Sequence, residues 1–204
     1  RQTGSGLPAV PVCGSIDSTK TGGQSVQRLF VGLELPRSVA EQLGRVRVEY
    51  STARWHPVQA LHLTLCFIGE VDAQAATAMA GALHDLPDPE LSLTIRGVGY
   101  FGTPERPRVL WAGVTAEAAL MQLQEEVEQR LVPVGLVPDT RAYRPHITLA
   151  RVQQGGEPLR AFLEGHADLA LPPFAVDHLS LYVSRGGEGG VRYEVIERFS
   201  WLKR

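Results

Sequence analysis

Apolar and polar positions along the chain follow two different periods, and the first half of the chain shows both. Residues 28–35 (RLFVGLEL) form an apolar run that stops at a proline, which predicts a strand. From Pro36, which suits the first turn of a helix, apolar side chains recur at steps of three or four residues. This spacing predicts a helix whose apolar face consists of Val39, Leu43, Val46 and Tyr50.

The next segment alternates with the period of a strand. It covers residues 61–68 (LHLTLCFI). Because successive side chains of a strand point to opposite faces, His62, Thr64 and Cys66 are expected on one face. The other face is expected to be apolar and to consist of Leu61, Leu63, Leu65 and Phe67.

A helix is predicted to follow, with Asp72 as its N-cap and its end near residue 86. Residues 91–101 (LSLTIRGVGYF) then predict a strand that closes the unit. The segment 97–102 matches Gly-x-Gly-x-x-Gly, the pattern of a dinucleotide-binding turn. Pro104 and Pro107 stand where the following helix would begin, so a turn between two units is expected instead.

The second half of the chain repeats this order of elements. A strand is predicted over 108–114, a helix after the cap residue Thr115, and a strand over 146–150. A short helix from Pro158 to Gly165 and a hairpin of residues 174–184 and 191–200 complete the half. The helix after Thr115 is expected to bury Ala116, Leu120, Leu123 and Val127 and to end near Pro133 and Gly135.

Matching elements lie a nearly constant distance apart along the sequence. His62 and His146 are 84 residues apart, and Leu91 and Phe174 are 83 residues apart. Internal repetition at one period is evidence about architecture. We therefore predict an α+β, bilobed fold with two similar lobes of antiparallel sheet and outer helices, related by a pseudo-two-fold axis around a central cleft.

Composition narrows the class of protein. The chain has 204 residues, 44% hydrophobic and 21% charged, which suffices for a buried core. A formal net charge of −2 excludes a generally basic nucleic-acid coat but leaves room for a local basic site. Cys13 and Cys66 are too few for a disulfide framework, so free thiols and a cytoplasmic location are expected. No apolar run approaches the roughly 18 residues of a membrane span.

The start of the chain differs from the rest. Residues 1–27 contain five Gly, two Pro and seven Ser or Thr, which predicts a flexible N-terminal extension. Residues 28–204 are predicted to form a single bilobed domain. Because such a domain is already a pseudo-dimer, a monomer is expected.

The repeated strand carries the polar residues that indicate chemistry. Residues 62–65 (HLTL) and 146–149 (HITL) share the pattern His-x-Thr-Leu, with the His and Thr on one strand face about 7 Å apart. Two histidines supply an acid and a base near neutral pH, and two hydroxyls can donate to anionic oxygens. If the strands meet in one cleft, the predicted substrate is a phosphodiester attacked by water, with no metal and no cofactor.

A purely structural interpretation is the alternative. One histidine on a strand is more often a structural residue than a catalytic one. A repeat alone could retain core residues such as Leu65 and Leu149, but it does not explain a polar pair that recurs on the outward face. The remaining histidines have no matching partner and are expected to be surface or structural residues: His56, His84, His166 and His178.

The motifs in residues 54–71 (RWHPVQALHLTLCFIGEV) and 141–152 (RAYRPHITLARV), with the opening RLFVGLELP, resemble the 2H phosphoesterase superfamily. Within it the chain is similar to the RNA 2′,3′-cyclic phosphodiesterases, also called 2′-5′ RNA ligases, over about residues 28–204. The resemblance implies a bilobed α+β fold. It also implies hydrolysis of a terminal 2′,3′-cyclic phosphate, on RNA ends or small nucleotides, to a 2′-phosphate.

The resemblance further implies a role for five residues. His62 is expected to donate a proton to the leaving 3′ oxygen and His146 to activate water. Thr64 and Thr148 are expected to hold the phosphate oxygens, and Arg151 to contact substrate. Because Arg151 lies five residues after His146, a strand end or a bulge must turn its side chain toward the site.

Other functions fit the same residues. The acid and base could run the reaction backwards and join RNA ends through a 2′-5′ linkage. A non-catalytic nucleotide- or RNA-binding module could use the cleft, although binding alone would tolerate Lys or Arg in place of the histidines. A zinc site on the two histidines lacks an obvious third ligand. Candidate rings for stacking a base are Phe30, Trp55 and Tyr143, with core packing as the alternative.

Overall fold

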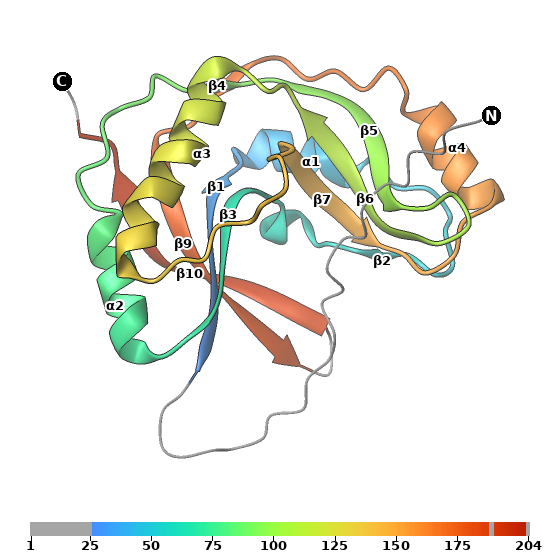
Figure 1. Ribbon diagram of the computed structural model, residues 1–204. Helices are drawn as coiled ribbons and strands as arrows, with labels where there is room; N and C mark the ends of the chain where they lie inside the picture. The colour runs from blue at the N-terminus through green and yellow to red at the C-terminus, as the bar shows by residue number, and fades with distance from the viewer. Residues whose placement is uncertain (1–25, 188–189, 203–204) are drawn as a thin grey trace, which may run out of the picture.

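The computed structural model describes residues 26–187 and 190–202 (Figure 1). The predicted extension, with Cys13, lies outside the described residues except for Val26 and Gln27, and Gln27 already begins the first strand. The elements in chain order are β1 (Gln27–Glu34), α1 (Arg37–Gly44), β2 (Arg54–Trp55), η1 (Val58–Ala60), β3 (His62–Val71), α2 (Ala73–Ala82), β4 (Ser92–Leu93), β5 (Ile95–Gly102), β6 (Pro107–Val114), α3 (Ala118–Leu131), η2 (Val132–Val134), β7 (His146–Arg151), α4 (Glu157–Gly165), β8 (Phe174–Ala175), β9 (His178–Gly187) and β10 (Gly190–Ser200).

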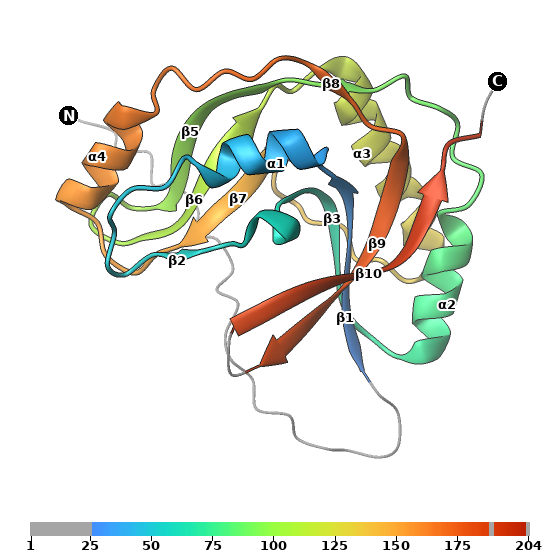
Figure 2. The same ribbon diagram turned by 180° about the vertical axis from the view of Figure 1, so that it is seen from behind.

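Most of the strands join one sheet, in the order β10-β9-β1-β3-β7-β6-β5, and β2 pairs with β7 off this path. The strands β4 and β8 form a separate two-stranded sheet. The described strand pairs are antiparallel. In Figures 1 and 2, α2 and α3 lie at one end of the molecule and α4 lies at the other. The structure therefore confirms the predicted α+β class with antiparallel strands and helices outside them.

The strand expected over 91–101 is placed differently from the prediction. It is split into β4 and β5, and β5 pairs with β6 instead of closing the first unit. In the same way the segment 174–184 is split into β8 and β9, and β9 pairs with β1. Each half of the sheet thus takes its outer strand from the other half of the chain, a long-range pairing that a local pattern does not encode.

The glycine motif at residues 97–102 lies within β5 and not in the expected turn. Gly99 is opposite Trp111 of β6, and a Cβ added at Gly99 would lie 2.3 Å from the indole ring. A glycine at this position therefore makes room for Trp111, whose ring centroid lies 6.4 Å from that of His146.

Two predicted helices differ in extent from their patterns. The helix α1 ends at Gly44, so Val46 and Tyr50 are buried from the segment that follows it. The helix α3 begins only at Ala118, and Ala116 lies outside it and is exposed. The Thr115 N–H donates to the Thr94 carbonyl, which holds residue 115 beside the segment before β5 and delays the start of the helix. Among the described residues, no helix is both long and apolar enough to cross a bilayer.

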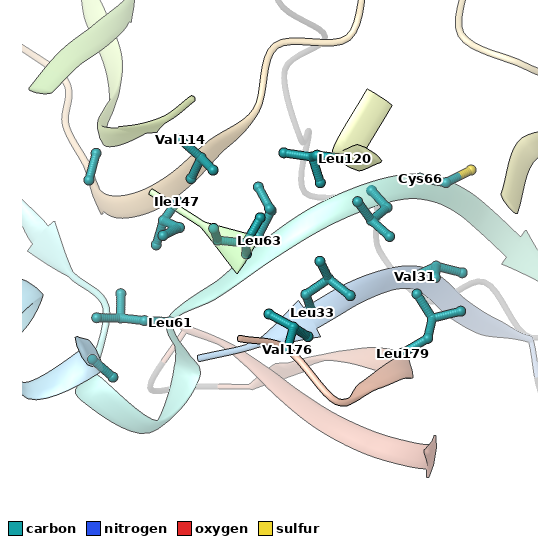
Figure 3. Close-up of a cluster of buried hydrophobic side chains, with 14 of the residues drawn as sticks. Val31, Leu33, Leu61, Leu63, Cys66, Val114, Leu120, Ile147, Val176 and Leu179 are labelled. Atoms are coloured by element: carbon teal, nitrogen blue, oxygen red, sulfur yellow. The ribbon is translucent and has the colours of Figure 1, made fainter. Parts of the chain in front are cut away.

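The core joins the two halves of the sheet behind the motif strands. The strands β3 and β7 pair at Leu63 and Ile147, and both side chains are fully buried. Figure 3 shows these two residues together in the cluster with Leu33, Val114 and Leu120. Burial of each such side chain stabilises the fold by about 1.5–3 kcal/mol. The packing fixes the two motif strands relative to each other, and the polar residues beside Leu63 and Ile147 point the other way.

Candidate active site

The two motif strands carry the same irregularity at the same place. In β3, Cys66 is opposite Val31 and Thr64 is opposite Gly32, so Leu65 is the extra residue of a β-bulge. In β7, Ala150 is opposite Leu110 and Thr148 is opposite Trp111, so Leu149 is the extra residue. A bulge reverses the alternation of faces beyond it. The sequence required such a turn for Arg151, and the structure has it.

The bulge in β3 corrects the prediction for the end of that strand. Cys66 does not share a face with His62 and Thr64 but is buried at 5% exposure in the core, where burial raises the pKa of its thiol to about 12 (Figure 3). Phe67 was predicted on the apolar face and is instead 68% exposed. Its position in the first motif corresponds to that of Arg151 in the second, where the side chain is also exposed.

The pairing of Leu63 with Ile147 brings the predicted catalytic residues together. One residue to either side, an antiparallel register places His62 beside Thr148 and Thr64 beside His146, on the face opposite the core. Burial is the main reason that the pKa of His62 is low, and a positive charge on His146 would lower it further. Neither threonine hydroxyl hydrogen-bonds to another group in the described part of the chain, so both are available to a ligand.

The two imidazoles are held in the same way. His62 Nδ1 lies 2.8 Å from the Ala60 carbonyl, and His146 Nδ1 lies 2.7 Å from the Arg144 carbonyl. Because a carbonyl oxygen only accepts, Nδ1 must be the protonated nitrogen in each neutral ring. Nε2 then carries the lone pair of a base, and it becomes an N–H donor when the ring is protonated.

Aromatic rings surround both imidazoles. Phe30 stacks on His62 at 4.8 Å between ring centroids, and Tyr182 and Tyr193 lie at 5.2 and 5.0 Å from it. The edge of Phe101 lies against His146 at 4.8 Å.

Burial among these rings lowers the pKa of His62 to about 4 and also lowers that of His146. The carbonyl bonds to Nδ1 act in the opposite sense. Both rings are therefore neutral at pH 7 in the free protein, and an anion between them would favour protonation.

A third histidine, predicted as a surface or structural residue, lies close to His62 and Arg151. His56 follows β2, stacks on Tyr193 at 5.7 Å and 9°, and its backbone N–H donates to the Leu149 carbonyl of β7. Burial lowers its pKa to about 4, with smaller contributions from the charges of His62 and Arg151. In the sequence, the position of His56 is indicated only by the alternation of Arg54, Trp55 and His56. Three residues are too few to predict a strand.

A pocket of about 460 Å³ adjoins His62 but not His146. Tyr182, Tyr193 and Glu34 line it together with the chain around Ala60. Burial alone would raise the pKa of Glu34, but hydrogen bonds from Arg198, Ser180 and His178 lower it to about 2. The pocket beside His62 thus has in its wall a carboxylate that is ionised at neutral pH and paired with Arg198.

The other candidate residues have structural partners. The Tyr143 hydroxyl donates to the Thr64 carbonyl at 2.8 Å and supports β3 from outside the site. Trp55 packs on Phe162 of α4, at 6.1 Å between centroids. His84 pairs with Glu197 and His178 with Glu34, as expected for structural residues. In the described part of the chain, no three His, Cys, Asp or Glu side chains cluster in a way that could hold a metal ion.

Comparison with known proteins shows the family to which this chain belongs. Residues 35–188 match the family model of the 2′-5′ RNA ligase superfamily, and the chain belongs to that superfamily. An RNA 2′,3′-cyclic phosphodiesterase of Thermotoga maritima is 32% identical over 177 residues, which cover 83% of this chain and 92% of the relative. The RNA 2′,3′-cyclic phosphodiesterase of Escherichia coli is 29% identical, over 85% of this chain and 96% of the relative.

Solved structures give the same result. The crystal structure of E. coli LigT complexed with 3′-AMP has a TM-score of 0.70 and 27% identity to this chain. The match covers 87% of this chain and 99% of that one.

Proposed function

We propose that this chain is an RNA 2′,3′-cyclic phosphodiesterase, which hydrolyses a terminal 2′,3′-cyclic phosphate on RNA or a nucleotide to a 2′-phosphate. The observation that carries the proposal is the pair of imidazoles on adjacent strands, each with Nδ1 on a backbone carbonyl and Nε2 left for chemistry. The relatives with the same name extend over most of the chain and support the same reaction.

In the proposed mechanism, His146 Nε2 takes a proton from water as the water oxygen attacks phosphorus. The bond from phosphorus to O3′ breaks, and His62 Nε2–H gives its proton to O3′. The sum of the steps is the addition of one water molecule. Thr64 and Thr148 donate hydrogen bonds to the phosphate oxygens, and Arg151 contributes positive charge. Because both free imidazoles are neutral at pH 7, the bound phosphate must raise the pKa of His62 before it acts as the acid.

The pocket supports the assignment of His62 as the acid. In an in-line displacement the attacking water and the leaving oxygen lie on opposite sides of phosphorus. The ribose therefore lies on the side of the acid. The 460 Å³ pocket adjoins His62 and gives the nucleoside room there. Phe67, exposed on the same strand beyond the bulge, offers a ring on which a base can stack.

We also propose that the chain forms one domain of two similar halves. The strand order β9-β1-β3 on one side and β5-β6-β7 on the other supports two halves related by a pseudo-two-fold axis, with the active-site cleft where β3 meets β7. Residues 28–204 would form this single bilobed domain, preceded by a flexible extension. A monomer in the cytoplasm that acts without a metal is consistent with this organisation.

Turnover of adenosine 2′,3′-cyclic phosphate in the presence of EDTA tests the proposal. The expected product is adenosine 2′-phosphate, identified by its phosphorus NMR signal. A 3′-phosphate product would contradict the assignment of the leaving oxygen, and loss of activity with EDTA would contradict a metal-independent reaction. Binding without turnover would favour the non-catalytic module.

Ligation is a second candidate because the acid and base can serve both directions. The matched family model is described by ligase activity, which favours testing it. Rates of cyclic-phosphate hydrolysis and 2′-5′ joining measured on one oligonucleotide would rank the two.

A further inference from the structure

Two arginines lie directly opposite each other at the edge of the site. In the β2–β7 pair, Arg54 is opposite Arg151 and Trp55 is opposite Ala150. Residues opposite each other in an antiparallel pair point to the same side of the sheet, and like charges in that position repel. This arrangement costs stability unless an anion lies between the two side chains.

Neither guanidinium has a protein counter-ion in the described part of the chain. Both residues are exposed, and no hydrogen bond or ion pair joins either side chain to a described residue. Arg141, by contrast, pairs with Asp139, and Arg160 pairs with Glu157. Two arginines at opposed positions, without a counter-ion among the described residues, suit a phosphate, which accepts bidentate hydrogen bonds from arginine.

The pair faces the active site and not the core. Trp55 lies between Arg54 and His56 in the chain, and its ring packs on Phe162 of α4. Because side chains alternate along a strand, Arg54 and His56 point away from α4, to the side where His56 stacks on Tyr193.

Arg151 stands on β7 beyond the bulge, about 7 Å along the strand from Thr148. The arginine pair is thus one step along the strand from the proposed phosphate-binding threonine.

We propose that Arg54, together with Arg151, forms a second phosphate subsite that binds the internucleotide phosphodiester next to the terminal cyclic phosphate. This inference rests on the proposed function and narrows its substrate to RNA chain ends. A chain with a net charge of −2 has no general attraction for RNA, so a local pair of cations is needed to favour a chain end over a mononucleotide.

The test compares two substrates, adenosine 2′,3′-cyclic phosphate and the dinucleotide ApA with a terminal 2′,3′-cyclic phosphate. For Arg54→Ala, kcat/KM is expected to fall about tenfold on the dinucleotide and to stay within twofold on the mononucleotide. The slope of log kcat/KM against log salt on the dinucleotide should weaken by about 0.7, as for one lost phosphate contact to a single strand. Arg54→Lys should restore part of the loss, since it keeps the charge without the guanidinium fork.

Arg160→Ala is the control, because it also removes one guanidinium but from α4, where Arg160 pairs with Glu157. This variant is expected to leave kcat/KM unchanged on both substrates. Equal losses on both substrates for Arg54→Ala, or no loss on the dinucleotide, would overturn the subsite.

Binding of ApA with a terminal 2′-phosphate and of adenosine 2′-phosphate, measured by calorimetry, separates this outcome from failure of the proposed function. If wild-type protein hydrolyses neither substrate, the reaction is wrong. The subsite still stands only if the dinucleotide binds about tenfold tighter to wild type than to Arg54→Ala.

Discussion

The two motif strands are alike where the reaction is proposed and unlike where the substrate extends away from it. The strands β3 and β7 share the His-x-Thr pair, the bulge, and the bond from Nδ1 to the carbonyl two residues earlier. Beyond the bulge, β3 presents the exposed ring of Phe67 and β7 presents the charge of Arg151.

The surroundings of the two strands differ in the same sense. The pocket adjoins the His62 end, and the unpaired arginines lie at the far end of β7. In the proposed mechanism, the features that repeat supply the acid and the base. The features that differ would give the substrate one orientation, which a symmetric site could not impose.

Removing either imidazole should have the largest effect and tests the shared features. His62→Ala and His146→Ala are each expected to lower kcat/KM for a nucleoside 2′,3′-cyclic phosphate by about a thousandfold, because each removes one proton-transfer group. His84→Ala, outside the site and paired with Glu197, is the control and should remain near wild type. Near-normal activity in His62→Ala or in His146→Ala would show that this histidine is not needed as the acid or the base.

Removing the hydroxyl of Thr64 or Thr148 should have the next largest effect on activity. Thr64→Val and Thr148→Val keep the shape of the side chain and remove the hydroxyl, so each is expected to lower kcat about a hundredfold through a lost donor to the transition state. Thr77→Val on α2 serves as the control, because it removes a hydroxyl that donates to the Ala73 carbonyl of its own helix. Wild-type kcat in both motif variants would show that the hydroxyls do not hold the reacting phosphate.

Arg151 and Phe67, the positions at which the two motif strands differ, should have smaller effects, and these effects should fall on KM. Arg151→Ala is expected to raise KM about tenfold on any cyclic phosphate, because it removes a charge. Phe67→Ala is expected to raise KM about fivefold on a nucleoside cyclic phosphate and to leave a base-free ribose cyclic phosphate unchanged. If both variants respond alike to the base-free substrate, the proposed difference between the two ends of the site is wrong.

The buried histidines should also affect stability in acid, separately from catalysis. Since the folded pKa of His56 and His62 is about 4, below the ordinary 6.5, unfolding takes up protons and the free energy of unfolding falls as pH drops from about 6.5 to 4. Between pH 7 and 4, His56→Gln should lose about 2 kcal/mol less than wild type in denaturant unfolding. Identical losses would mean that His56 is not buried in its neutral form.

Some parts of the fold and of the candidate site can be predicted from the sequence, and others cannot. The recurrence of His-x-Thr-Leu predicts the catalytic pair, and the five-residue spacing to Arg151 requires the bulge that β7 contains. The same bulge in β3 was missed, since alternation of apolar residues continues through Phe67 and gives no sign of it.

The exchange of β5 and β9 between the halves depends on contacts far apart in the chain. His56 escapes local analysis because β2 is only two residues long and its place is fixed by β7.

The proposed mechanism requires one phosphate to lie between His62 and His146, and a titration with adenosine 2′-phosphate followed by histidine NMR tests this placement. We expect the imidazole signals of both residues to move together with one dissociation constant, and the pKa of each ring to rise on binding. Movement of only one ring, or two unrelated dissociation constants, would contradict it.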